Sequence, residues 1–433
     1  PSKNISVVKS SHGCISATIL DALLSAAVCA ACGGPERDGS AFTFDEAGMA
    51  YRVEFRSENT VRILARPAGS PLVTRRLVVD SLPAAPVEVR REAIEHGYAF
   101  RTPQLRVEFD RTRGLFSFRD ARTGTLLLEE TARSLRPDTV GGEACYAVTQ
   151  RFAGTDDEAL YGLGQYQTGA LNYKRDTVLL LQANKDIVNP YLVSTRGFGL
   201  LWDNYSASEF RDGGDAFEFT SEVGDAVDYW FVYGGDPAGC VRGYRALTGA
   251  ASMLPKWAFG FWQSRERYKT FDELTGVVSE YRRRHIPIDV IVQDWEYWGE
   301  KPHWNALVWD SVRFPNPKAA IDRLHEEFGV RLLVSVWPGF GPETAVYRDL
   351  EAAGALFDER TWAGYKVFDA YNPAARDIVW SHFRTGLFDT GVDGWWMDAT
   401  EPSFREGFTQ RKQEARTKSA GKTRMGAFHR YLN

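Results

Sequence analysis

The chain has 433 residues, of which 44% are hydrophobic and 13% are aromatic, and its formal net charge is −5 at pH 7. A chain of this length is too long for one ordinary domain, so two domains with sizeable cores are expected. The slightly acidic charge balance gives no sign of the basic surface that nucleic-acid binding requires, so no nucleic-acid partner is expected.

The first 39 residues are interpreted as a leader or a disordered segment. Residues 15–34 are mostly apolar and small, and Lys3 and Lys9 precede them, which is the pattern of a secretory leader. Asp21 interrupts this run, so an ordinary N-terminus remains the alternative. A leader predicts a secreted or periplasmic protein, and the alternative predicts a cytoplasmic one. No other stretch approaches the roughly 18 apolar residues that span a bilayer, so no membrane span is expected.

The cysteines are too few and too scattered to form a disulfide framework. The five cysteines stand at positions 14, 29, 32, 145 and 240. Only Cys29 and Cys32 are close together, and neither a second pair nor a nearby histidine accompanies them. Such a spacing is a weak metal signal. We therefore expect no metal and no cofactor.

Residues 40–253 have the pattern of an all-β domain. Short segments in which apolar and polar residues alternate recur between turn residues, as in strands with one buried face. The expected strands span 51–55, 61–64, 105–109, 115–120, 125–128, 178–182, 199–202 and 228–232. Many short strands without intervening helices favour a β-sandwich.

From residue 254 onward, strand and helix patterns alternate. The expected strands span 258–262, 286–292 and 331–337, and a fourth strand ends at Asp398. Between them, Thr270 and Glu273 form a capping-box pattern, and Asn316 and Asn372 each stand before a proline that can open a helix. This alternation predicts parallel strands of a (β/α) barrel, the TIM barrel.

The predicted barrel is incomplete. Residues 254–433 are fewer than the about 250 residues that an eight-stranded barrel takes. Residues 405–422 are polar and charged, and no strand pattern follows them. The expected fold class is therefore α/β plus all-β, with an N-terminal β-sandwich followed by the first half of a (β/α)8 barrel over residues 254–433. We interpret the chain as a fragment or a truncated gene product.

Tryptophan and carboxylate residues recur at the ends of the four predicted barrel strands. In chain order they are Trp262 with Arg265, Asp294 with Trp295, Trp337, and Trp395 with Asp398 and Glu401. The carboxyl ends of barrel strands meet at one rim, where barrel enzymes keep their chemistry. Indole rings pack on sugar faces, so a carboxylate beside them indicates glycoside chemistry. Packing of each tryptophan and helix capping by Asp294 remain the structural alternatives.

Four segments of the chain resemble glycoside hydrolase family 31. They are Phe-Trp-Gln-Ser-Arg-Glu-Arg-Tyr-Lys at 261–269, Gln-Asp-Trp-Glu-Tyr-Trp-Gly at 293–299, Phe-Asp-Ala-Tyr-Asn-Pro at 368–373 and Trp-Trp-Met-Asp-Ala-Thr-Glu-Pro at 395–402. The sequence is most similar in character to the α-xylosidases of that family, because its α-glucosidases more often have Asn near the final Glu-Pro. The resemblance covers about residues 50–405.

The resemblance implies a retaining hydrolase of non-reducing terminal α-xylosyl or α-glucosyl residues in oligosaccharides. By the family motif, Asp398 is the nucleophile that forms a covalent glycosyl-enzyme, and Asp294 holds sugar hydroxyls. Trp337 and Trp395 are expected to wall that subsite, and Glu401 to orient its neighbours. The remaining substrate-binding residues are expected to be Trp262, Arg265, Trp295 and, beside the sandwich loop that the family places at the barrel mouth, Tyr166.

One departure from the family concerns the acid/base carboxyl, which the family supplies as an Asp on a later strand. After Asp398 the only carboxylate side chains in the sequence are Glu401, Glu406 and Glu414. Three alternatives stay open: a hydrolase whose acid/base lies in a missing part, an inactive fragment with at most carbohydrate binding, and an α-glucosidase or transglycosidase of the family. We expect the isolated chain not to turn over aryl α-xylosides. The oligomeric state is not indicated.

Overall fold

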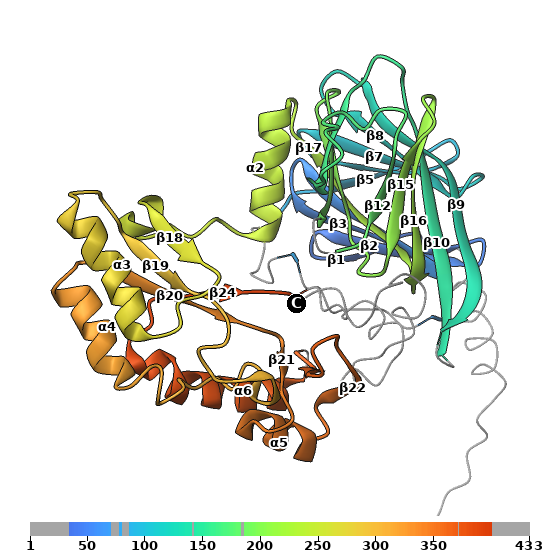
Figure 1. Ribbon diagram of the computed structural model, residues 1–433. Coiled ribbons are helices and arrows are strands. Elements are labelled where there is room, and N and C mark those ends of the chain that lie inside the picture. Colours follow the sequence, from blue (N-terminus) through green and yellow to red (C-terminus); the bar gives the residue numbers. More distant parts are fainter. Residues whose placement is uncertain are drawn as a thin grey trace, which may run out of the picture.

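The computed structural model describes residues 34–70, 78–79, 86–140, 143–182, 186–370 and 372–400. Figure 1 shows an antiparallel β-sandwich, and beside it a smaller α/β unit that is joined to the sandwich after helix α2. Most of the predicted leader lies outside the described residues, as does Glu401. The end of that segment forms strand β1 (Glu36–Asp38), which pairs with β2 (Ala41–Glu46).

The described part of the sandwich consists of two antiparallel sheets, which confirms the predicted β-sandwich. The first sheet contains, in spatial order, β1, β2, β3 (Met49–Ser57), β4 (Thr60–Pro67), β17 (Val227–Tyr233), β14 (Phe198–Trp202), β13 (Ile187–Ser194) and β11 (Leu160–Gln165). The second contains β12 (Thr177–Leu180), β15 (Ser208–Asp212), β16 (Ala216–Gly224), β10 (Glu143–Ala153), β9 (Leu126–Val140), β8 (Leu115–Asp120), β7 (Leu105–Asp110), β6 (Gly97–Arg101) and β5 (Arg90–Ile94).

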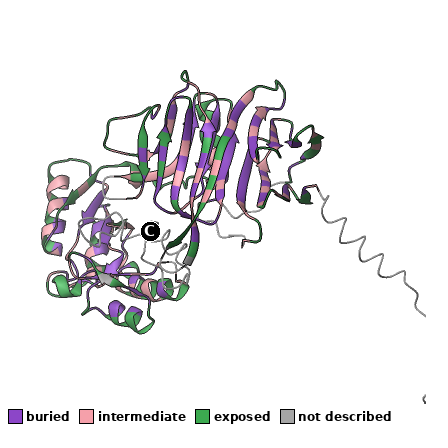
Figure 2. Cartoon of the chain, turned by 90° about the vertical axis from the view of Figure 1, so that its right-hand side faces the viewer, coloured by how far each residue is buried: buried purple, intermediate pink, exposed green. Residues whose placement is uncertain are grey.

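Aromatic side chains from both sheets fill the space between them. Phe118 of β8 stacks on Phe231 of β17 with ring centroids 4.2 Å apart, and Phe152 of β10 meets Tyr229 of β17 at 5.3 Å. Buried and exposed residues alternate along the strands, as Figure 2 shows. This alternation is the period of two that places every second side chain in a core. Burial of each Phe side chain stabilises the folded state by about 1.5–3 kcal/mol relative to leaving that side chain exposed to water.

Helix α2 (Pro237–Thr248) covers part of the first sheet and ends the sandwich. Asp236 caps it by accepting a hydrogen bond from Gly239 N at 2.6 Å. The Tyr191 hydroxyl donates to Cys240 O at 2.7 Å, and the rings of Tyr191 and Tyr244 stack 4.5 Å apart. These contacts fasten the helix to the sandwich at the point where the chain leaves for the second unit.

The second unit is built on a four-stranded parallel sheet. Its strands are β18 (Trp262–Arg265), β19 (Val290–Gln293), β20 (Arg331–Val336) and β24 (Gly394–Met397), adjacent in that order. Four parallel strands in chain order, with helices between them, are the arrangement expected of one part of a TIM barrel. The predicted fold class is therefore confirmed, with a sandwich followed by a partial barrel.

Helices cover one face of this sheet (Figure 1). They are α3 (Phe271–Arg283), α4 (Pro317–Glu326), α5 (Ala345–Ala352) and α6 (Pro373–Gly386), with short 3₁₀ turns η1 (Lys256–Phe259), η2 (Lys301–His303) and η3 (Phe388–Thr390). Leu274, Ile321 and Phe383 of three of these helices are buried in one cluster with the outward-facing residues of the strands. Among the described residues, no helix is long and apolar enough to cross a membrane.

Side chains cap the helices that begin after Thr270 and Asn372, but the predicted capping box is only half formed, because Glu273 Oε2 accepts from Lys269 N at 2.7 Å and not from Thr270 N. Thr270 Oγ1 accepts a hydrogen bond from Glu273 N at 3.1 Å, and Asn372 Oδ1 accepts one from Ala374 N at 3.0 Å. Asn316 stands before Pro317 as predicted, but it has φ 48° and its side chain makes no capping bond. Its left-handed backbone turns the chain into α4 without help from the side chain.

The first barrel strand was predicted in the wrong place. The apolar segment 258–262 begins in the second half of the 3₁₀ turn η1, and the strand begins only at Trp262. The connection from β20 to β24 also contains a small antiparallel sheet that the sequence pattern did not identify. Its strands are β21 (Gly339–Phe340), β23 (Lys366–Phe368) and β22 (Leu356–Arg360).

Candidate functional site

The carboxyl ends of the four parallel strands lie at one edge of the sheet. In the pairing register, Gln293 lies between Arg265 and Val334, and Val334 pairs with Trp395. Asp294 therefore follows directly at the end of β19. The amide of Asp398 still donates to Val336 O at 2.9 Å, so Asp398 stands just past the end of β24.

The two faces of the sheet have different roles. Ile291, Leu332 and Val334 belong to the core under the helices, whereas Val290 and Leu333 belong to a second cluster on the opposite, inner face. Side chains alternate between the faces of a strand. Within the strands this alternation assigns Ser335 and Trp396 to the inner face. Glu266, Asp294 and Trp337 each follow the last residue of a strand and continue the same alternation, although the Trp337 ring also packs against the core under the helices. Asp398, two residues after Trp396, continues the same series.

Asp294 is a buried carboxylate, with 8% of the residue exposed. Burial raises the pKa of Asp294 above its ordinary value, and the nearby negative charge of Glu266 raises it further. The amide of Trp295 opposes this rise by donating a hydrogen bond to Asp294 Oδ1 at 2.7 Å. The Ser335 hydroxyl also lowers this pKa, although it forms no hydrogen bond of full geometry.

Trp295 is held in place from several sides. Its indole Nε1 donates to Glu266 Oε1 at 3.1 Å, and the guanidinium of Arg267 lies 4.7 Å from its ring centroid. Arg267 is itself paired with Glu296. The buried Trp304 contacts the Trp295 ring at a centroid distance of 5.4 Å. This clamp fixes the position of Trp295 directly after Asp294.

Trp337 belongs to an aromatic group at the same edge. Its ring meets Trp304 edge-on at 5.0 Å and Tyr365 at 6.1 Å. Buried Asn305 donates to both Trp337 O at 2.7 Å and Gly339 O at 3.2 Å. The loops that follow β19 and β20 are thereby tied together beside Asp294.

Asp398 begins a turn at the end of β24. Its Oδ1 accepts a hydrogen bond from Ala399 N at 2.8 Å, and Ala399 has φ 50°. Glu401, predicted to orient its neighbours, lies outside the described residues.

Three of the predicted site residues on the barrel strands do not lie at the inner face of the carboxyl edge. Trp262 pairs with Val290 at the amino end of the sheet, because β18 begins four residues later than predicted, and its ring packs near Trp257 at 6.3 Å. Arg265 lies at the correct end but faces outward, where it pairs with Glu273 of α3 at 2.7 Å. Trp395 also faces outward, with its ring 4.2 Å from that of Phe383 in α6.

Tyr166 lies on the sandwich, directly after β11. Its hydroxyl donates to Leu163 O at 2.9 Å, and its ring meets Tyr173 edge-on at 6.4 Å. The ring packs against the sandwich core. These contacts hold Tyr166 in the sandwich and bring it to none of the barrel residues named above.

Sequence reasoning missed Ser335, and it named both Trp395 and Trp396 as rings that could pack on a sugar but chose Trp395 for the wall of the subsite. Trp396 is 40% exposed, and Ser335 is fully buried beside Asp294. Alternation places Trp396 on the side of Asp398 and Ser335 on the side of Trp337, but only the strand register identifies that side as the inner face.

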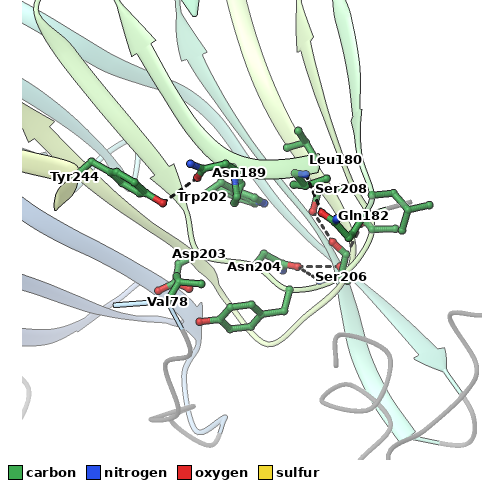
Figure 3. A pocket seen from close by; sticks show the side chains of 15 residues that line it. Val78, Leu180, Gln182, Asn189, Trp202, Asp203, Asn204, Ser206, Ser208 and Tyr244 are labelled. Carbon is green, nitrogen blue, oxygen red and sulfur yellow. Dashed lines mark hydrogen bonds between the residues drawn. The ribbon is translucent and has the colours of Figure 1, made fainter. Parts of the chain in front are cut away.

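A cavity of about 330 Å³ lies elsewhere, in the sandwich at the loop from β14 to β15 (Figure 3). Tyr244 and Asn189 are joined across one side of it by a hydrogen bond of 3.1 Å. None of the predicted site residues lines this cavity. In the described part of the chain, no three His, Cys, Asp or Glu side chains are grouped as metal ligands.

Comparison with known proteins matches two consecutive family models to the chain. Residues 50–210 match the N-terminal galactose mutarotase-like domain of glycosyl hydrolase family 31, and residues 251–432 match the TIM-barrel domain of the same family. The matches coincide with the sandwich and the parallel sheet. Both structural units are thus accounted for by one family.

Among the curated relatives, an alpha-xylosidase of Saccharolobus solfataricus is 37% identical over 367 residues, covering 82% of this chain and 48% of the relative. Alpha-glucosidase 2 of Bacillus thermoamyloliquefaciens is 27% identical over 395 residues, covering 84% of this chain and 48% of the relative. The chain spans about half the length of these two relatives.

The fold of a solved relative agrees with these matches. The crystal structure of a family 31 alpha-xylosidase from a soil metagenome, complexed with xylose, is 30% identical, with a TM-score of 0.78. The similarity covers 87% of this chain and 59% of that structure. With two consecutive domain models and this fold in agreement, the chain belongs to glycoside hydrolase family 31.

Proposed function

We propose that this chain carries the nucleophile and part of the sugar-binding site of a retaining α-glycosidase. Its substrates are oligosaccharides with a non-reducing terminal α-xylosyl or α-glucosyl residue. The observation that carries the proposal is the register of the parallel sheet, in which Asp294, Ser335, Trp337 and Trp396 share the inner face at the carboxyl edge and Asp398 continues the series.

In the proposed reaction, the Asp398 carboxylate attacks the anomeric carbon of the terminal sugar while the bond to the leaving oxygen breaks. The resulting glycosyl-enzyme ester is then hydrolysed by water, which restores the carboxylate. Retention follows because the anomeric carbon is inverted twice.

The neighbours of Asp398 have binding roles in this proposal. Asp294 accepts hydrogen bonds from hydroxyls of the terminal sugar, and these bonds are strongest when it is ionised. Trp396, exposed on the same face, offers its ring to the sugar, and the clamped ring of Trp295 limits the space beside Asp294. We propose Glu401 as a residue that orients Asp398, as the sequence motif implies.

A retaining glycosidase also needs a second carboxyl, about 5 Å from the nucleophile, to protonate the leaving oxygen. We assign this role to none of the described residues. We propose that it comes from a part of the family barrel that the four described strands do not include. The whole activity then depends on residues from outside this sheet.

Two observations favour an α-xylosyl over an α-glucosyl substrate. The relative at 37% identity is named an alpha-xylosidase, whereas the alpha-glucosidase is 27% identical. The residues after Asp398 are Ala-Thr-Glu-Pro, without the Asn that α-glucosidases of the family more often have. An α-glucosyl substrate is the alternative.

The proposal can be tested without the acid/base carboxyl. A 5-fluoro-α-xylosyl fluoride has a leaving group that departs without protonation, so only the nucleophile is needed to form the ester. We expect intact-mass spectrometry to find one added fluoroxylosyl group, and peptide mapping to place it on Asp398. Faster labelling by the corresponding glucosyl fluoride would instead favour the alternative substrate.

Matched variants separate the nucleophile from other carboxylates. Asp398→Asn should abolish the label, whereas Asp389→Asn, which changes an exposed carboxylate paired with Arg384, should leave it unchanged. Equal labelling of Asp398→Asn and the unaltered chain would contradict the proposed role. A chain that binds xylose but takes up no label would correspond to the binding-only alternative.

A further inference from the structure

One tryptophan of the α/β unit is conspicuously exposed. Trp362 exposes 62% of its surface, the largest exposed fraction among the 13 tryptophans, all of which lie in the described part of the chain. Isolated exposed apolar residues are common on protein surfaces. The surroundings of Trp362 distinguish it from such residues.

The turn that carries Trp362 is held rigidly at the tip of the β22–β23 hairpin. Thr361 N donates to Tyr365 O at 2.9 Å, and Gly364 N donates to Thr361 O at 3.0 Å. Arg360 Nη1 donates to Gly364 O at 2.8 Å, and Gly364 takes the left-handed φ of 86° that the turn needs. The indole is thus presented on a preorganised support, which lowers the entropic cost of binding.

A continuous path of aromatic rings leads from Trp362 to the candidate site. The buried ring of Trp304 meets Trp362 edge-on at 5.8 Å and Trp337 edge-on at 5.0 Å. Trp304 also stacks on Tyr365 at 5.2 Å with an interplanar angle of 13°. Trp362 and Trp337 therefore flank the same buried ring, and a chain of a few sugar units can reach from one to the other.

The elements that carry these rings leave the sheet at its carboxyl edge. Trp304 lies in the connection after β19, and Trp337 and Trp362 lie in the connection after β20. These are the same connections that begin at Asp294 and Trp337. Trp362 thus lies in a connection that leaves the sheet at the edge where Asp294 and Asp398 stand.

We propose that Trp362 is an outer binding platform for the leaving-group part of a neutral oligosaccharide, the sugar units that follow the terminal one. The inference rests on the proposed function and adds a second point of contact for the substrate. The apolar C–H faces of pyranose rings pack on an indole, and this contact requires no charge on the ligand. It predicts that recognition extends beyond the terminal sugar.

The test measures binding by the full chain with isothermal titration calorimetry. The probes are free xylose and an α-xylosyl-capped gluco-oligosaccharide of four units. We expect Trp362→Ala to raise the Kd of the oligosaccharide about tenfold, as loss of an aromatic anchor does. The Kd of xylose should stay unchanged, and Trp362→Phe should restore most of the affinity.

Trp380→Ala is the matched control. Trp380 is 51% exposed and lies on α6, where its ring contacts Phe383 and Phe388. The control should leave both Kd values unchanged. If Trp362→Ala and the unaltered chain bind the oligosaccharide with the same Kd, the proposal that Trp362 is a binding platform is wrong.

The proposal is also wrong if the unaltered chain does not bind the oligosaccharide. The covalent labelling of Asp398 described above then tells whether the proposed function itself survives.

Discussion

Trp395 and Trp396 are neighbours in β24 but face opposite sides of the parallel sheet. Trp395 packs against Phe383 of α6 with ring centroids 4.2 Å apart, whereas Trp396 pairs with Ser335 in register and is 40% exposed on the inner face. One ring therefore supports the fold, and the other is available to a ligand.

This difference predicts opposite effects of two alanine substitutions. Trp395→Ala should lower the free energy of unfolding by about 3 kcal/mol, because it removes a ring that packs between strand and helix. Trp396→Ala should cost less stability but weaken xylose binding. Chemical denaturation and calorimetry would measure the two effects. Equal losses of stability with unchanged xylose binding in Trp396→Ala would contradict the assignment of faces.

A second prediction concerns Asp294 and pH. Its pKa is raised by burial and by Glu266 above the ordinary value of 3.8, so the folded state binds more protons than the unfolded state between these two pKa values. Stability therefore falls as the pH rises through that interval, and the loss is complete above the raised pKa. Asp294→Asn removes the buried charge, so the variant should be more stable than the unaltered chain at pH 7 while binding xylose more weakly.

The gain in stability from Asp294→Asn should vanish when the pH falls below the ordinary pKa, because the unaltered chain is then protonated as well. Thermal unfolding at several pH values would measure this. If the stability gain of Asp294→Asn instead grew as the pH falls, this would contradict a raised pKa of Asp294.

A third prediction separates the charge of Glu266 from its hydrogen bond. Glu266→Gln retains an oxygen that can accept from Trp295 Nε1, a bond of 3.1 Å in the unaltered chain, but removes the negative charge. The pKa of Asp294 should therefore fall toward its ordinary value. Because xylose binding is expected to follow the ionisation of Asp294, the pH at which xylose affinity is half-maximal should fall in this variant. An unchanged midpoint would mean that burial alone sets this pKa.

A fourth prediction concerns Asp393, at the amino end of β24. Its carboxylate bonds to His325 Nε2 at 2.7 Å, Leu332 N at 2.9 Å and Arg331 Nη1 at 3.2 Å. Asp393→Ala leaves these partners unsatisfied and should destabilise the fold by about 3 kcal/mol. Since Asp393 lies at the opposite end of the strand from Asp398, covalent labelling of Asp398 below the melting temperature should continue. Loss of labelling in a folded Asp393→Ala variant would argue against a purely structural role.

Several features of the α/β unit could be predicted from the sequence because they depend on local chemistry. The caps formed by Thr270 and Asn372 require only a side-chain oxygen within reach of the next amides. The strand positions of Asp294 and Asp398 follow from apolar runs that end in a carboxylate. Their placement at one edge then follows from the parallel order of the strands.

Other features could not be predicted because they depend on where a strand begins. The apolar run at 258–262 suggested a strand, but only tertiary packing places β18 at Trp262 and turns Arg265 toward Glu273. The small sheet of β21, β22 and β23 was missed because strands of two to five residues are too short to show a period.

The amino-acid sequence by itself determined the two-domain plan, the order of the parallel strands and the edge at which the carboxylates of residues 294 and 398 lie. Only the tertiary structure decided which of Trp395 and Trp396 lies on the inner face of the sheet and which supports a helix, and how Trp304 connects Trp337 to Trp362. The physical reason is that hydrophobicity marks a residue for burial or exposure, whereas the face it occupies depends on strand register and on partners far away in the chain.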